Sequence, residues 1–463
     1  MSKNSKARQY AQMMSRRSLV KWSVAAGAAL GLKPWQVFDV LETNAGVALA
    51  ADAACHPTNR SVHIIGGTGG FAWFQLLWPH NDIAAANNPN FAFHAPGEQT
   101  MATNTDRPLT LGPEAPWKNL NGKRQVSAFM SGVNQTHTNA PSSSSTIDGN
   151  TSLFAACASM QSTNPTLVPV IAVDDVGVGN ASGAPNVARV GSGDAIVGLF
   201  NSAASRAGGI LANSADAELY DANYKAFLSL SRMAGRPTSK RSLTTGREAS
   251  ALLGTNLADA LAPSDADLAR YGLGGATPTK LVNLGRTLIV TAKAFAMGLT
   301  SSVVMPAMKD DPHGAFANMA SLRSTVTSLG MILDAFMDDL TSLDDPSCSS
   351  KLADTTVISI HGDTPKNPLV RSGWPDGTPG NSNWVYALGA GHLRTGWHGG
   401  IDRNSNVTGF DPTTGNNAQV SSNSTKEAAS AAIAYAVARG DMRRVEEHYK
   451  GGDISGIVVP VTL

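Results

Sequence analysis

Short runs of consecutive apolar residues, each ending in glycine or polar turn residues, recur along the chain. They are SVHII (61–65), TLVPVIAV (166–173), SSVVMP (301–306), TTVISI (355–360) and NWVYALGAG (383–391). A strand with one solvated face alternates apolar and polar residues, whereas a strand covered on both faces is apolar throughout. The runs therefore predict strands that are buried on both faces of a mainly parallel sheet.

Helical patterns lie between and after these runs. Residues 285–299 are apolar almost throughout, and residues 424–441 begin at a Ser/Thr cap and stop at Gly440. The clearest pattern spans 315–341, where apolar residues three or four positions apart form one stripe: Phe316, Met319, Leu322, Val326, Leu329, Leu333, Phe336 and Leu340. Alternating strands and helices predict a layered α/β fold with right-handed crossovers. No convincing linker interrupts residues 56–463, so we expect a single domain there.

The N-terminal region carries a targeting signal. Residues 15–32, SRRSLVKWSVAAGAALGL, place Arg16 and Arg17 before an apolar run, which is the pattern read by the bacterial twin-arginine (Tat) translocon. The run ends at Leu32 and is too short for a bilayer helix, which needs about 20 residues. We therefore assign residues 1–50 to a signal region. We expect the Tat translocon as a partner during export, no transmembrane span, and a periplasmic or extracellular destination.

Charge and cysteine content narrow the possible partners. The formal net charge of +1 gives no electrostatic reason to expect binding to nucleic acid or to an anionic membrane. Cys55, Cys157 and Cys348 are far apart in the sequence and have no C-x-x-C spacing, which argues against a zinc-thiolate site. One disulfide is possible in an oxidising compartment, but the sequence does not choose the pair.

Candidate metal ligands follow two of the predicted strands. In doubly wound sheets, ligands bind beyond the carboxyl ends of the strands. Asp311 and His313 come after the run at 301–306, and His361 and Asp363 come after the run at 355–360. Carboxylate and imidazole groups suit zinc, calcium, magnesium or manganese, so these four residues are predicted metal ligands. The structural alternative is that Asp311 caps the following helix and His313 is a turn residue.

Two further motifs bear on catalysis and on cofactor binding. His137, in NQTHTNAP after a possible strand, is the candidate catalytic residue. The turn HIIGGTGGFA fits the dinucleotide pattern G-x-G-x-x-A, but the region about 20 residues further on, AAANNPNF, has no acidic residue. We therefore expect no nucleotide cofactor. The absence of a G-x-S-x-G motif argues against an α/β-hydrolase esterase.

Several of these stretches, in this order, resemble a Tat-exported bacterial family known as domain-of-unknown-function family 1501. That family is grouped with the alkaline phosphatase and sulfatase superfamily. After the twin-arginine leader, the resemblance lies in SVHIIGGTGGFAWFQLLWP, QTHTNAP, Asp311-Pro312-His313, Gly362-Asp363-Thr364-Pro365 and YALGAGHLRTGWHGGI. It implies an alkaline-phosphatase-like fold with a mostly parallel central sheet and helices on both faces. It also implies hydrolysis of phosphate or sulfate esters with one or two metals held by Asp and His.

The resemblance can be carried over for some residues but not for others. Asp311 and His313 match metal-side positions, and His137 matches the family's histidine. Thr68 and Gly69 stand where the opening turn of the family usually has an acid, Ile360 replaces another acid, and Asp363 replaces an arginine. The family's later Asp-His pair has no equivalent in DGTPGNSNW. Losing these ligands weakens binding of a divalent ion.

Two functions from different classes follow, and whether the protein is an enzyme stays open. The first is an exported, non-catalytic protein with a degenerate metal site and no required metal, which binds a cell-surface or extracellular protein partner. The second is a metal-dependent hydrolase of phosphate or sulfate esters with a rearranged site. In the second, Asp311, His313, His361 and Asp363 bind the metal and His137 contacts the substrate.

Overall fold

The computed structural model describes residues 55–67, 72–79, 100–101, 106–118, 120, 124–135, 137–164, 166–204, 257–362, 366–367, 370, 372–375, 382–402 and 406–461. The chain divides into two compact units. The larger one comprises Ala54–Asn164, Val168–Val197 and Leu261–Leu463, and it contains the sheet described below. The predicted signal region, residues 1–50, lies outside the described residues, and the single-domain prediction for 56–463 stays a prediction.

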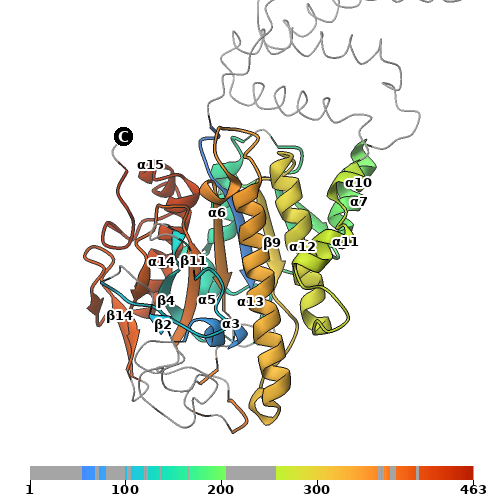
Figure 1. Ribbon diagram of the computed structural model, residues 1–463. Helices are drawn as coiled ribbons and strands as arrows, with labels where there is room; N and C mark the ends of the chain where they lie inside the picture. Colours follow the sequence, from blue (N-terminus) through green and yellow to red (C-terminus); the bar gives the residue numbers. More distant parts are fainter. Residues whose placement is uncertain are drawn as a thin grey trace, which may run out of the picture. The chain divides into compact units, whose positions relative to one another are not determined.

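A central eight-stranded sheet organises the larger unit (Figure 1). Its spatial order is β12 (Gly396–His398), β4 (Ser127–Val133), β11 (Ser382–Leu388), β10 (Thr356–His361), β1 (Arg60–Ile65), β9 (Ser302–Pro306), β7 (Val170–Val173) and β8 (Val187–Val190). β11 runs antiparallel to both of its neighbours, and every other neighbouring pair in this sheet is parallel. Seven strands therefore present their carboxyl ends at one edge of the sheet.

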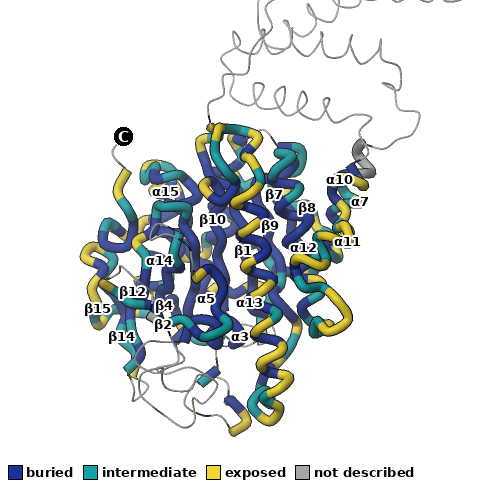
Figure 2. Tube along the Cα trace, viewed as in Figure 1, coloured by how far each residue is buried: buried dark blue, intermediate teal, exposed yellow. Residues whose placement is uncertain are grey.

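The central strands are buried on both faces, as the continuous apolar runs predict. Every residue of β1, β10 and β11 is buried, and Figure 2 shows these strands within the interior of the molecule. In β1, Val62 and Ile64 point to one face, while Ser61, His63 and Ile65 point to the other. The register is continuous from Arg60↔Thr356 to Ile65↔His361.

One face of the sheet is covered by α6 (Leu153–Gln161) and α14 (Ser422–Val437). Ile65, Val357 and Val385 of the sheet share a hydrophobic cluster with both helices. Small residues dominate the buried side of α14, which brings that helix close to β4. A larger side chain at these alanine positions would overpack the interface.

The opposite face is covered by α3 (Ala72–Leu77) and α13 (Met319–Ser342), with α12 (Thr279–Ala296) beside α13 (Figure 1). Tyr386 of β11 lies 5.1 Å from the ring of Trp78, which stacks on Trp117 at 5.4 Å. The indole of Trp117 donates a 2.9 Å hydrogen bond to the carbonyl of Leu333 in α13. This aromatic layer joins the sheet to the long helix.

The remaining described elements are short. The helices are α5 (Ser142–Ser145), α7 (Gly193–Ala204), α10 (Leu257–Leu261), α11 (Asp265–Arg270), α15 (Met442–Val445) and the 3₁₀ turns η3 (Ala315–Ala317) and η4 (Leu352–Asp354). The strands are β2 (Thr100–Met101), β3 (Thr110–Leu111), β5 (Thr146–Asp148), β6 (Thr151–Ser152), β13 (Gly400–Ile401), β14 (Val407–Phe410) and β15 (Asn417–Ala418). Among the described residues, no helix combines the length and the apolar character needed to cross a bilayer.

The structure confirms a mixed α/β fold with a large, mostly parallel sheet and helices around it. The run at 166–173 forms a strand only from Val170, after Pro169. The helix predicted at 315–341 begins at Met319, because the Asn318 side chain accepts a hydrogen bond from the amide of Ser321. The structural alternative of Asp311 as the cap of this helix is therefore wrong.

Candidate functional site at the carboxyl edge of the sheet

The segment that follows β9 carries the acidic residues of the candidate site. β9 ends at Pro306, and the chain then runs along the carboxyl edge of the sheet to His313. The backbone amide and the Nδ1 atom of His313 both contact Oδ1 of Asp311, which closes a tight local turn. Asp311 and His313, two of the predicted metal ligands, therefore lie together, and their role as ligands stays a prediction.

His137 reaches the same carboxylate from the loop after β4. Its Nε2 atom lies 3.6 Å from Oδ2 of Asp311. The backbone at His137 has a φ of 44°, in the left-handed region that few non-glycine residues adopt. The loop is held against the end of β7 by Asn139, whose side chain donates to Asp175 at 2.5 Å and whose carbonyl accepts from Gly177 at 2.8 Å. The structure thus brings together His137, Asp311 and His313.

A lysine that the sequence analysis did not single out completes this cluster. The Nζ atom of Lys366 lies 3.0 Å from Oδ1 of Asp311 and 3.1 and 3.4 Å from the two ring nitrogens of His313. The Lys366 side chain is 0 % exposed, and its backbone amide donates to the side chain of Gln75 in α3 at 3.2 Å. We call His137, Asp311, His313 and Lys366 the edge cluster.

Lys366 favours the ionised form of the Asp311 carboxyl group in the edge cluster. Burial acts to raise the pKa of Asp311, but hydrogen bonds from Lys366 and His313 outweigh it and hold the pKa below its ordinary value. Asp311 is 41 % exposed, so water screens part of this interaction. At neutral pH the Asp311 carboxylate is ionised and already has a cationic partner.

The other described carboxylates at the ends of β7 and β9 also have lysine partners. Lys309 lies 2.8 Å from Asp174 and 3.3 Å from Asp175. Lys280 lies 2.5 Å from Asp310, and its Nζ atom is 4.3 Å from the centre of the Trp73 ring. A buried or half-buried carboxylate needs a cation, and at this edge lysine side chains supply it.

His361 does not join the edge cluster. It is the last residue of β10 and is 0 % exposed, with its ring 4.8 Å from that of Phe154 in α6. Its Nδ1 atom lies 2.8 Å from the carbonyl of Ser144, and its Nε2 atom lies 2.6 Å from the hydroxyl of Ser359. That hydroxyl lies 2.7 Å from Nδ1 of His63. We call His63, Ser359 and His361 the buried histidine chain.

Burial keeps both rings of the buried histidine chain neutral, and the partner atoms then fix which nitrogens carry the protons. Burial lowers the pKa of His361 to about 4, although the hydrogen bond to Ser144 acts to raise it. Burial, followed by the proximity of His361, lowers the pKa of His63 well below its ordinary value. With both rings neutral, His361 Nδ1–H donates to Ser144, the Ser359 hydroxyl donates to His361 Nε2, and His63 Nδ1–H donates to Ser359. Both nitrogens of His361 are thus engaged inside the fold.

The fourth predicted ligand, Asp363, lies outside the described residues, as do Thr68 and Gly69. Within the part of the chain that is described, no group of three or more His, Cys, Asp or Glu side chains has the arrangement of a metal site. Of the four predicted ligands, Asp311 and His313 thus lie together, whereas His361 lies elsewhere in the fold.

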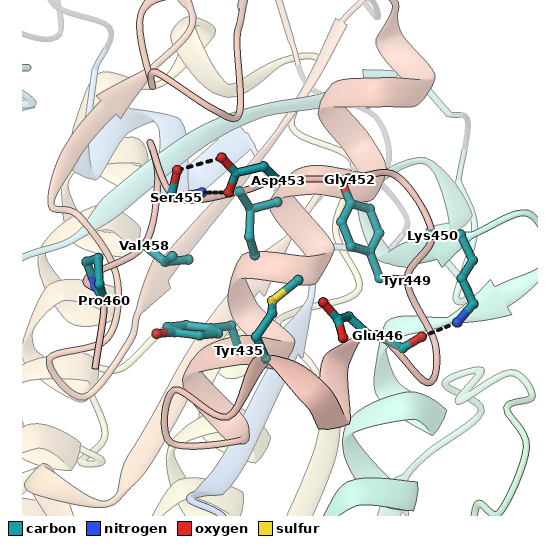
Figure 3. Close-up of a pocket in the computed structure, with 11 residues that line it drawn as sticks. Tyr435, Glu446, Tyr449, Lys450, Gly452, Asp453, Ser455, Val458 and Pro460 are labelled. Atoms are coloured by element: carbon teal, nitrogen blue, oxygen red, sulfur yellow. Dashed lines mark hydrogen bonds between the residues drawn. The ribbon is translucent and has the colours of Figure 1, made fainter. Parts of the chain in front are cut away.

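Two cavities show what size of ligand the described surface could hold. One of about 200 Å³ lies beside the edge cluster and is lined by residues that include Trp73, Lys280, Asp310 and Asp311. A second, of about 640 Å³, is formed by α14, α15 and the segment up to Pro460 (Figure 3). Small-molecule sites usually measure about 300–1,000 Å³, so the second has the more suitable volume.

The charge around the larger cavity is mixed, because Lys450 lines it together with Glu446 and Asp453. Burial, together with the negative charges of Glu427, Asp148 and Asp453, raises the pKa of Tyr449 to about 12. Figure 3 shows Tyr435 and Tyr449 with Glu446 and Asp453 around the same space. A phosphate or sulfate group there would meet two carboxylates of like charge and one lysine.

The fold and the site define a mixed α/β protein whose sheet edge carries carboxylates paired with lysines. Comparisons of the chain with protein-family models, with curated protein sequences and with solved structures find no match.

Proposed function

We propose that this is a Tat-exported protein on an alkaline-phosphatase- or sulfatase-like scaffold, with a binding or cell-surface assembly role in place of metal-dependent hydrolysis. Its destination is the periplasm or the cell exterior, and its partner there is a cell-surface or extracellular protein. The observation that carries the proposal is the position of the Lys366 ammonium group between Asp311 and His313.

The lysine competes with a divalent ion for the same ligands. A metal bound by Asp311 and His313 would lie about 2.0–2.5 Å from each donor atom. The Lys366 Nζ atom already lies 3.0 Å from Oδ1 of Asp311 and 3.1 Å from Nδ1 of His313. Two positive charges at 4 Å repel by about 4 kcal/mol per unit charge at the effective dielectric near a protein surface. The edge cluster therefore does not fit a resident metal.

The departures from the family pattern support the same proposal. Ile360, which stands where the family has an acid, is buried in β10 and pairs with Ile64 of β1. Its side chain offers no oxygen donor for a metal ion. His361, the neighbouring candidate for a replacement ligand, has both ring nitrogens engaged by Ser144 and Ser359.

One observation favours the second candidate function, a hydrolase with a rearranged site. His137 and His313 approach Asp311 from two different loops at the carboxyl ends of the strands, where α/β folds bind ligands. In a phosphate or sulfate ester hydrolase, this is the position expected for substrate-contacting and metal-binding side chains. The Asp311 carboxylate and the His313 imidazole would have to be released from Lys366 first.

Metal titration of the purified protein tests the choice between the two. Thermal unfolding is followed with Mg²⁺, Ca²⁺, Mn²⁺ or Zn²⁺ for the unmodified chain, for Lys366→Met, and for Lys280→Met as a matched control. Lys280→Met removes a lysine from the neighbouring Asp310 and leaves the edge cluster intact. We expect a metal-dependent rise in the Tm of Lys366→Met and none for the other two. A rise for the unmodified chain, together with metal-dependent cleavage of a phosphate or sulfate monoester, would favour the hydrolase.

A further inference from the structure

Two of the three cysteines, far apart in sequence, are neighbours in the fold. Cys55 is exposed just before β1, and Cys348 is partly buried in the loop between α13 and η4. Both thiols are free, and each perturbs the pKa of the other, which indicates that the two side chains lie close together. Cys157 is 0 % exposed inside α6, where it packs in the hydrophobic cluster. The fold therefore brings Cys55 and Cys348 close together and keeps Cys157 apart in the hydrophobic cluster.

A buried ion pair holds the Cys348 loop against the segment that carries Cys55. Arg60, at the start of β1, lies 2.6 Å from Asp345, and both side chains are almost fully buried. The same carboxylate accepts hydrogen bonds from Thr355 at 2.6 Å and from the amide and hydroxyl of Ser347 at 2.8 and 2.7 Å. These contacts fix the loop at the residues next to Cys348 in the sequence, so the two thiols are held in place by the fold.

A guanidinium group lies beside the pair. Arg439, just after α14, donates a 3.4 Å hydrogen bond to the carbonyl of His56 and interacts with both thiols. Burial acts to raise the pKa of Cys348, but hydrogen bonds from Cys55, Ser350 and Arg439 lower it. The hydrogen bond to Cys348 is the main cause that raises the pKa of Cys55. Ionisation is thus favoured at Cys348 over Cys55.

We propose that Cys55 and Cys348 form an intramolecular disulfide once the folded chain meets a disulfide oxidant. The Cys348 thiolate attacks a sulfur of the oxidant's disulfide, which forms a mixed disulfide and releases one thiolate. Cys55 then loses its proton and displaces the second oxidant thiolate, so the protein loses two protons and two electrons and the oxidant becomes a dithiol or two thiols. The Cys55–Cys348 bond fastens the segment entering β1 to the loop after α13.

The exposure of Cys55 matters for when the bond forms. A Tat passenger folds before export, so only thiols that are accessible in the folded chain can be oxidised afterwards. This timing rests on the proposed export, whereas the pairing rests on the contacts alone.

Oxidation of the purified full-length chain tests the pairing directly. The protein is incubated with oxidised glutathione, free thiols are alkylated under denaturing conditions, and the disulfide is mapped by mass spectrometry after proteolysis. We expect a monomer with a Cys55–Cys348 linkage in which only Cys157 is alkylated. Cys157→Ala, the matched control, still forms the bond, whereas Cys55→Ser and Cys348→Ser do not. The oxidised chain has a Tm about 5 °C higher than the reduced chain, and this rise is absent in both serine variants.

Three results would overturn the pairing: separate glutathionylation of the two cysteines, a disulfide-linked dimer, or a bond that involves Cys157. The compartment is tested separately by trapping thiols in the native cells before lysis. If the trapped protein is reduced although the purified protein forms the bond, the export proposal fails and the pairing stands.

Discussion

His313 follows β9 and His361 ends β10, the two strands that flank β1 in the sheet, yet the edge cluster and the buried histidine chain use them in different ways. His313 lies in the loop after β9, is 42 % exposed and contacts Asp311 and Lys366. His361 ends β10, is fully buried and bonds to Ser144 and Ser359. The first is placed where a ligand could reach it, and the second is part of the interior.

The difference comes from the two-residue period of a strand. Side chains of Val357, Ser359 and His361 point to one face of β10, and Val357 packs in the cluster with α6 and α14. His361 must point to the same face, against Phe154. A residue at the end of a strand is therefore a site candidate only when the chain has already turned away from the sheet, as it has at His313.

The largest expected difference between the buried histidine chain and the edge cluster is the loss of stability when each histidine is replaced by alanine. His361→Ala leaves a cavity and removes the partner of the Ser144 carbonyl and the Ser359 hydroxyl, so we expect a loss of about 3 kcal/mol in the free energy of unfolding. His313→Ala, at a half-exposed position, should change it by less than about 1 kcal/mol. Urea denaturation of both variants measures the difference. Equal losses would show that the two histidines do not differ in this way.

The pH dependence of stability sharpens the same comparison. The pKa of His361 is about 4 in the folded chain and about 6.5 when unfolded, so the unfolded state binds more protons between these values. The free energy of unfolding therefore falls as pH drops from 6.5 to 4, and His361 contributes up to about 3 kcal/mol of this fall.

Denaturation curves at several pH values between 4 and 7 check this prediction. His361→Ala should show a shallower slope than the unmodified chain, while His313→Ala keeps the slope. An unchanged slope in His361→Ala would contradict the buried, neutral state of this ring.

The smallest expected effect concerns the carboxylate of the edge cluster. In Lys366→Met, burial of Asp311 is no longer outweighed by the lysine, so the pKa of Asp311 should rise. Carbon NMR of the Asp311 carboxyl group measures the shift, with Lys280→Met as the control that leaves it unchanged. A pKa that stays the same in Lys366→Met would mean that the lysine does not neutralise this group.

The hydrophobic pattern predicts most of the central sheet, because buried strands and amphipathic helices depend on local periodicity. β1, β9, β10, α13 and α14 all fall within a few residues of their predicted positions. The pattern does not predict the antiparallel direction of β11, since an apolar run has the same character in either direction. It also misses β12, whose His398 stacks on Phe129 at 4.9 Å.

The candidate site was predictable only in part. Asp311 and His313 are two residues apart, so their contact follows from local geometry. Lys366 and Gln75 come from distant parts of the chain, and a lone lysine has no spacing that would mark it. Contacts between the Cys55 and Cys348 segments likewise depend on the tertiary fold, through Arg60 and Asp345.

The most direct test of the central claim is elemental analysis of the mature protein purified from its native cell envelope, beside an Asp311→Ala/His313→Ala variant. We predict no stoichiometric zinc, calcium, magnesium or manganese in either protein, because Lys366 supplies the positive charge that the edge cluster requires. Stoichiometric metal in the unmodified protein that disappears in the variant would contradict this claim and make the hydrolase the better interpretation.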